Sequence, residues 1–241
     1  MADFLIPEWP APDNVRALQT LRHGGCSPAP WDSLNLGDHV GDDSQRVMAN
    51  RARLRASLPA DPCWLQQVHG VDVVDAASAA PGTAADAAYA RVPGSVCAVM
   101  TADCLPVLFC DRAGTVVAAA HAGWRGLLAG VLEQTLATMG CPAGTILAWL
   151  GPAIGPDNFE VGDEVRSAFI ARNAEAAGAF RAAGGGKWLA DLYALARLRL
   201  SIAGVAGIYG GGGCTFAERD RFFSYRRDGV TGRQASLIWL S

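Results

Sequence analysis

Two apolar runs joined by a turn constrain the fold of this chain most. Residues 107–110 and 116–120 are continuous apolar segments, the pattern of buried strands. Residues 111–114 between them, Asp-Arg-Ala-Gly, have the composition of a tight turn. Cys104 lies just before the first run and His121 just after the second. Polar groups at strand ends beside glycines often form sites, so we take this pair as the centre of the chain.

The bulk properties exclude several classes of protein. The chain has 241 residues, of which 51% are hydrophobic, so it is long enough for a full core in one domain or two. Its net charge of −3 argues against a general nucleic-acid binder. No apolar run approaches the roughly 18 residues of a membrane span, and the N-terminus has no secretory pattern. Seven cysteines without a CxxC pair argue against a disulfide framework, so we expect a reducing, cytoplasmic location.

Periodicity and capping residues predict the other elements. Helices are expected from residue 43 or 44, over 127–139, from 163 to about 171 and from 191 to about 202. Strands are expected over 15–21, 71–75, 145–150, 205–209 and 235–240, with a strand and turn at 64–70 and a surface loop at 76–90. Strands and helices do not alternate strictly, which argues against a doubly wound fold.

A His/Cys/His set is the most specific chemical feature. Two of the four histidines, His69 and His121, each lie at a strand end before Gly or Ala-Gly, and Cys104 completes the set. Thiolate and imidazole are preferred zinc ligands, and three protein ligands leave a position for water, whose pKa zinc brings to about 7. The same atoms would serve a second scheme, with Cys104 as nucleophile and His121 as its base. Asp103 could exchange protons or orient groups in either scheme, or only cap a turn.

Arg125 suggests an anion site beside this set. It lies just past His121, at the start of the helix predicted for residues 127–139. An arginine and the free N–H groups of a helix N-terminus together bind anions such as phosphate. The alternative is an ordinary ion pair between Arg125 and a surface carboxylate.

Several short motifs, spread over nearly the whole chain, form a specific combination. They lie at residues 67–70 (QVHG), 101–106 (TADCLP), 121–126 (HAGWRG), 20–27, 35–43, 151–156 and 223–229. Together they resemble the YfiH-like laccase-domain family, whose members are described as purine nucleoside phosphorylases, polyphenol oxidases or peptidoglycan editing factors. The resemblance implies an α+β fold, a four-layer αββα arrangement of mixed β-sheets in a single domain over residues 1–241.

The resemblance also implies a function. The family's zinc ligands correspond to His69, Cys104 and His121, with Cys104, His121 and Asp103 as catalytic residues. The implied reactions are phosphorolysis of adenosine, inosine and methylthioadenosine, and deamination of adenosine. We assign substrate or phosphate binding to Arg22, Asn35 and Arg125. We expect a monomer that acts on purine nucleosides and phosphate, without nucleic-acid or membrane partners.

Three alternatives stay open. The first is a copper-dependent polyphenol oxidase. A multicopper oxidase needs on the order of ten histidine ligands, and the chain has four, so copper is expected only as a single ion substituting for zinc. A cytosolic hydrolase that edits peptidoglycan precursors could use either zinc hydroxide or the Cys104–His121 dyad. A binding module without enzymatic activity is the third alternative.

Overall fold

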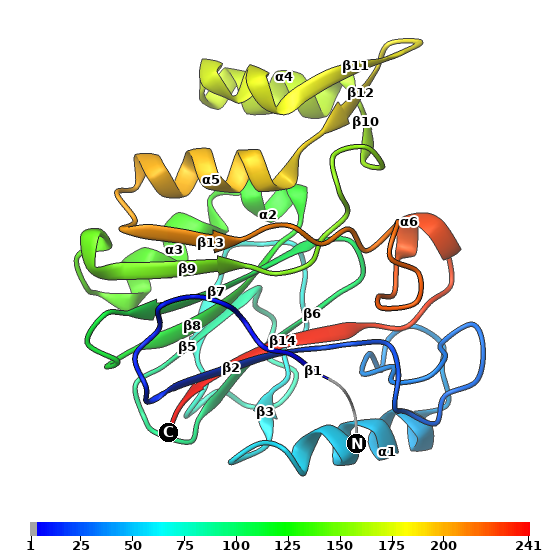
Figure 1. Ribbon diagram of the computed structural model, residues 1–241, viewed down its shortest axis with the longest axis vertical. Helices are drawn as coiled ribbons and strands as arrows, with labels where there is room; N and C mark the ends of the chain where they lie inside the picture. Colours follow the sequence, from blue (N-terminus) through cyan, green and yellow to red (C-terminus); the bar gives the residue numbers. More distant parts are fainter. Residues whose placement is uncertain (1–3) are drawn as a thin grey trace.

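The computed structural model describes residues 4–241, and two large sheets form its centre (Figure 1). The first sheet has the strand order β1 (Phe4–Leu5), β2 (Val15–Thr20), β14 (Gln234–Leu240), β6 (Val96–Thr101) and β3 (Pro62–Cys63). The second has the order β13 (Gly207–Gly210), β9 (Ile146–Leu150), β7 (Leu105–Asp111), β8 (Val117–Ala122), β5 (Ala87–Ala90) and β4 (Val73–Asp75). Both sheets contain parallel and antiparallel pairs.

The two sheets pack face to face, and helices cover their outer faces. Between the sheets, side chains of β6 and β14 such as Val99 and Ile238 meet those of β7 such as Leu108. Leu54 of α1 (Ser44–Arg55) packs on the outer face of the first sheet. The helices α2 (Trp124–Ala129), α3 (Val131–Met139) and α5 (Leu192–Ile202) cover the second sheet. The predicted four-layer αββα arrangement is therefore confirmed, since each sheet buries one face on the other sheet and one on helices.

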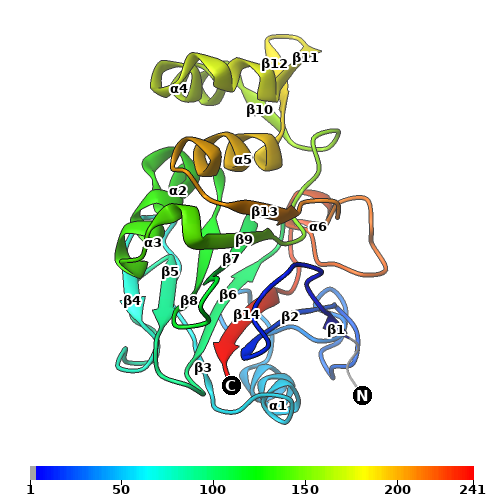
Figure 2. The same cartoon turned by 60° about the vertical axis from the view of Figure 1, so that its left-hand side comes forward.

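A small unit extends this body at one end. The strands β10 (Glu160–Gly162), β12 (Lys187–Ala190) and β11 (Phe180–Gly184) form a three-stranded antiparallel sheet beside α4 (Asp163–Arg172). Figures 1 and 2 show this unit beyond α5, on the side away from α1. Phe169 and Phe180 join the same apolar cluster as α5, so the unit shares the main core. Short helices occur at Ala143–Thr145, Ala174–Ala179 and α6 (Tyr225–Asp228).

Local sequence signals explain several boundaries. The side chain of Asp43 accepts hydrogen bonds from the backbone N–H groups of Gln45 and Arg46, which caps α1 as predicted. Asp191 caps α5 in the same way. The hairpin of β7 and β8 is confirmed, with Pro106 paired with His121 and Cys110 with Val117.

Three expectations were wrong, and one strand was missed. The single helix predicted for 127–139 is two helices, because Gly130 between α2 and α3 has φ of +112°, in the left-handed region. The predicted loop 76–90 ends in a buried strand, β5, because its alanines fit between β4 and β8. Residues 64–70 form no named strand and make only an isolated bridge at Gln66. The strand β6, which lies between β14 and β3 in the first sheet, was not predicted at all.

Among residues 4–241, no helix is both long enough and apolar enough to cross a membrane.

Candidate metal centre

The structure brings the three sequence-predicted ligands together. Cys104 directly precedes β7, His121 lies in the paired strand β8, and His69 lies in the loop before β4. The ligand atoms of these residues all lie within 4.8 Å of one another. His121 is buried, Cys104 is half-buried and His69 is exposed, so the cluster is open to solvent on the side of His69.

The distance between Cys104 and His69 and the donor types of the three residues suit one metal ion. Cys104 Sγ lies 3.7 Å from His69 Nε2. Two atoms bound to the same zinc ion can be at most about 4.4 Å apart, the sum of bond lengths of roughly 2.3 Å to sulfur and 2.1 Å to nitrogen. One thiolate and two imidazoles are a zinc-type set, and they also accept copper. These three residues would hold the ion.

Asp86 organises the cluster, and the sequence analysis missed it. It is fully buried, and its carboxylate accepts a hydrogen bond of 2.7 Å from His121 Nδ1. The same carboxylate accepts from the backbone N–H groups of Val68, His69 and Gly70, at 3.1, 2.9 and 2.6 Å. Asp86 thus leaves His121 Nε2 for a metal and fixes the loop that carries His69. A lone acid in an alanine-rich run of the sequence was the signal for it.

The ligands lie on unusual backbone. Within residues 4–241, the only non-glycine residues with positive φ are His69, at +62°, and Asp103, at +96°. The carboxylate of Asp86 holds the first, and the carboxylate of Asp103 holds the second by accepting from Thr215 Oγ1 and the backbone N–H of Arg226. Such strained residues cost about 1–3 kcal/mol and persist only where the surroundings enforce them.

Gly123 supplies the space that the ligands need. A Cβ atom at this position would lie 2.8 Å from Cδ2 of His69 and 2.9 Å from Sγ of Cys104. Both distances are shorter than carbon makes with such atoms. The glycine two residues after His121 is therefore required by the packing of the ligands.

The polar contacts also change proton affinities in the metal-free cluster. Burial opposes charge on the Cys104 thiol, but the charge of His121 and hydrogen bonds from His121 and His69 lower its pKa from 9.0 to about 6. Burial likewise opposes charge on His121, but Cys104 and Asp86 raise its pKa from 6.5 to about 9. Without metal, the pair is therefore a thiolate and an imidazolium near neutral pH, the state of a cysteine nucleophile.

The remaining predicted site residues have different surroundings. Asn35 is fully buried, and its amide bonds Gly37, Asp42 and the backbone N–H of Arg233, which are contacts that hold a loop. Arg22 is also buried and binds the backbone of Asp32 and Arg219. The structure thus gives both side chains structural contacts.

Arg125 and Asp103 are the last two predicted site residues. Arg125 is exposed at the start of α2, and its guanidinium lies 4.3 Å from the ring centroid of Trp124. Asp103 uses both carboxylate oxygens in the contacts with Thr215 and Arg226. These contacts orient the segment that precedes Cys104, and the proposed proton-transfer role of Asp103 stays a prediction.

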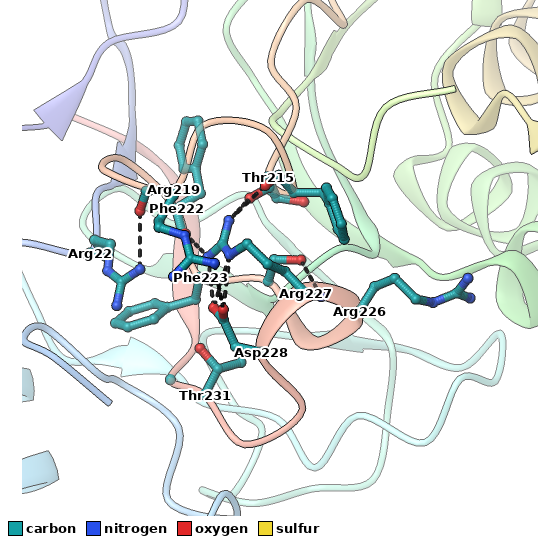
Figure 3. Close-up of polar contacts among 12 residues, drawn as sticks. Arg22, Thr215, Arg219, Phe222, Phe223, Arg226, Arg227, Asp228 and Thr231 are labelled. Carbon is teal, nitrogen blue, oxygen red and sulfur yellow. Dashed lines mark hydrogen bonds and ion pairs between the residues drawn. The ribbon is translucent and has the colours of Figure 1, made fainter. Parts of the chain in front are cut away.

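A hydrogen-bond network around Arg227 holds the segment that contacts Asp103. The guanidinium of Arg227 donates to the carbonyl oxygens of Thr215, Phe216 and Phe222 and to Asp228 (Figure 3). Figure 3 shows the side chain of Arg226 directed away from this network. Because Arg227 fixes the backbone of Thr215, it indirectly places the hydroxyl that bonds Asp103.

The other histidines lie outside the cluster. Both His23 and His39 are exposed, and they contact the carbonyl of Asp220 and the side chain of Asp38, respectively. Within the part of the chain that the structure describes, the set of His69, Cys104 and His121 is the one group suited to a metal.

Comparison with known proteins identifies the family. The family described as multi-copper polyphenol oxidoreductase laccase matches residues 16–241. The chain belongs to this family. Its laccase description names several coppers, whereas the residues described here provide one three-ligand site.

Relatives in this laccase family have a different name. The chain is 58% identical to a purine nucleoside phosphorylase of Pseudomonas aeruginosa, over 100% of this chain and 99% of the relative. It is 57% identical to purine nucleoside phosphorylase YfiH of Escherichia coli, over the full length of both. Among solved structures, a Neisseria meningitidis protein matches with a TM-score of 0.96 and 58% identity, covering 99% of each chain. YlmD from Geobacillus stearothermophilus matches with a TM-score of 0.91 and 33% identity, covering 98% of this chain and 96% of the other.

Proposed function

We propose that this protein is a zinc-dependent purine nucleoside phosphorylase that also deaminates adenosine. The observation that carries the proposal is the convergence of His69, Cys104 and His121 within 4.8 Å. Full-length identity of 57–58% to proteins named purine nucleoside phosphorylase supports the choice of substrate. The seven free cysteines support a reducing, cytoplasmic location.

The residues of the cluster have separate roles. His69, Cys104 and His121 hold the ion, and Asp86 fixes the orientation of His121 and of the loop of His69. Zinc supplies Lewis acidity and lowers the pKa of water to about 7. In phosphorolysis a phosphate oxygen bonds ribose C1′, the bond from C1′ to the purine nitrogen breaks, and the base leaves with a proton. In deamination water adds to purine C6 and ammonia leaves.

The test compares wild type with Cys104→Ala. Bound metal is quantified, and each protein is incubated with adenosine, with and without phosphate, before chromatography of the products. We expect about one zinc per chain in wild type, adenine only with phosphate, and inosine in both conditions. Cys104→Ala loses the metal and both products, because two imidazoles alone hold zinc weakly.

A second cysteine variant is the control. Cys141 is also half-buried and outside the cluster, so Cys141→Ala should keep metal and products. Products that persist in Cys104→Ala would contradict the proposal. Wild type that binds no zinc but hydrolyses a cell-wall precursor would instead favour the Cys104–His121 dyad, which the lowered pKa of Cys104 supports.

A further inference from the structure

Arg233 lies beside the segment that carries Asp103 and Cys104, although the two are far apart in the sequence. In the sheet, Gln234 at the start of β14 pairs with Thr101 at the end of β6. Arg233 and Ala102 are the next residues beyond this pair, and Ala102 directly precedes Asp103 and Cys104. Antiparallel pairing brings it there, and no spacing in the sequence indicates it.

The backbone and side chain of Arg233 are held in place by their neighbours. Its N–H donates to Asn35 Oδ1 at 2.9 Å, and its Nη1 donates to the carbonyl oxygens of Thr231 and Gly232, at 3.2 and 3.0 Å. A Cβ atom on Gly37 would lie 2.7 Å from Cγ of Arg233, so glycine there leaves room for the arginine stem. The guanidinium is thus oriented before any ligand binds.

The charge of Arg233 has no carboxylate partner. Among residues 4–241 it forms no ion pair, and its Nε and Nη2 donate no hydrogen bond. Arg227, in contrast, uses Nε, Nη1 and Nη2 on protein oxygens. Burial lowers the pKa of Arg233, whereas the charges of Cys104 and Asp103 raise it, so this guanidinium lies within electrostatic reach of the cluster.

We propose that Arg233 binds the oxyanion substrate, inorganic phosphate, beside the metal-binding cluster. The edge formed by Nε and Nη2 offers two parallel N–H groups, the geometry that arginine uses for phosphate. Half-burial strengthens these charge-assisted bonds because less water competes for them. The identity of the anion as a co-substrate rests on the proposed phosphorylase function, whereas the anion site itself does not.

The competing candidates for phosphate are less suited to it. Arg22 already donates to the backbone of Asp32 and Arg219 and pairs with the carboxylate of Asp32 at 3.2 Å. Arg125 is exposed on a helix of six residues and stacks on its own neighbour, Trp124. Surface arginines of this kind gain little from an anion, because water screens the charge.

The experiment measures phosphate binding directly. Inorganic phosphate is titrated by calorimetry into zinc-loaded wild type, Arg233→Gln and Arg233→Lys. We expect Arg233→Gln to raise the Kd about 10- to 100-fold, as for loss of a charge-assisted pair of hydrogen bonds. The Kd of Arg233→Lys should lie between those of wild type and Arg233→Gln, because lysine keeps the charge and lacks the planar guanidinium. If the Gln variant does not fold, the Lys variant decides, and at least a threefold weakening supports the site.

A remote arginine provides the matched control. Arg166 on α4 is also half-buried, with its guanidinium 4.0 Å from the ring centroid of Trp188, so Arg166→Gln makes the same charge change far from the cluster. Its phosphate Kd should equal that of wild type. A Kd for Arg233→Gln within twofold of wild type, or no phosphate binding by wild type, overturns the proposal.

Turnover separates this proposal from the proposed function. If wild type binds phosphate through Arg233 but forms no phosphate-dependent product from nucleosides, the phosphorylase function fails and the anion site stands. If product forms and its phosphate KM is unchanged in Arg233→Gln, the site fails and the phosphorylase function stands.

Discussion

Individual buried polar contacts give the cluster its properties. Asp86 is the clearest case, since one carboxylate accepts four hydrogen bonds and touches the segments of two ligands. Burial raises the pKa of Asp86, but the hydrogen bond and charge of His121 and the N–H groups lower it overall. The residue therefore stays ionised and keeps accepting at neutral pH.

Replacing Asp86 should weaken metal binding. Asp86→Asn replaces one carboxylate oxygen by an NH₂ group, which donates hydrogen bonds and does not accept them. Whether this group faces the N–H groups of the loop or His121 Nδ1, the hydrogen bond at that position is lost. We expect zinc affinity, measured by competition with a chelator, to fall about 10- to 100-fold. Asp72→Asn changes an exposed carboxylate nearby and should leave the affinity unchanged. Equal affinity in Asp86→Asn and wild type would contradict the role of Asp86.

The reactivity of Cys104 should follow its lowered pKa. In metal-free protein, the thiolate with pKa about 6 is present above that pH and is lost as the pH falls through it. We expect the rate of alkylation by iodoacetamide to be nearly constant from pH 7 to 8 and to fall below about pH 6. Added zinc should protect the thiol. A rate that still rises toward pH 9 would show an ordinary thiol, and Cys104→Ala gives the background from the other cysteines.

At the scale of elements, a glycine sets a helix boundary that hydrophobic periodicity does not indicate. The apolar positions of residues 127–139 fit one helix, but Gly130 ends α2 and begins α3 with a left-handed backbone. The break lets α2 begin just after His121, while α3 packs Leu132 and Leu136 on β8 and its neighbours. Asp43 and Asp191 act in the opposite sense, because their capping side chains make the helix starts readable from sequence.

Gly130→Ala tests this break. A Cβ at Gly130 meets nothing nearer than 3.6 Å, so its cost is that of the left-handed backbone, about 1–2 kcal/mol of unfolding free energy. Urea unfolding measures it. Gly144→Ala is the control, since a Cβ there has no neighbour within 4 Å and the residue lacks a positive φ. A Gly130→Ala protein as stable as wild type would indicate that α2 and α3 can merge.

At the scale of the whole molecule, the packing of two sheets creates the site. The N-terminal strand β2 and the C-terminal strand β14 pair in the first sheet, where β14 also pairs with β6, and Gln234, the residue after Arg233, lies opposite Thr101. The second sheet places Cys104 and His121 at the same end of β7 and β8. Apolar side chains between the sheets connect the two arrangements.

A core truncation should therefore affect the entire chain at once. Leu108 is fully buried between the sheets, and Leu108→Ala is expected to lower the unfolding free energy by about 2–5 kcal/mol. We predict a single domain, and we therefore expect one cooperative transition by circular dichroism and tryptophan fluorescence alike. Met48→Ala, at an exposed position on α1, should change stability by less than about 0.5 kcal/mol. A separate transition for α4 and its small sheet would contradict the prediction of a single domain.

The sequence by itself determined the local parts of this protein. Apolar runs predicted β7 and β8, capping aspartates predicted α1 and α5, and the motifs predicted the ligand set and the four layers. These features depend on residues a few positions apart or on motifs that are specific in combination. They can therefore be predicted from the sequence without the structure.

Only the tertiary structure decided which polar side chains meet. Asp86 lies in an alanine-rich segment, and it becomes a partner of His121 because β5 pairs with β8. Arg233 adjoins the segment of Cys104 because β14 pairs with β6. Folding also buries Asn35 and Arg22 and gives both side chains structural contacts. Sheet pairing between distant segments depends on the joint burial of many side chains, a free energy that hydrophobic periodicity within one segment does not contain.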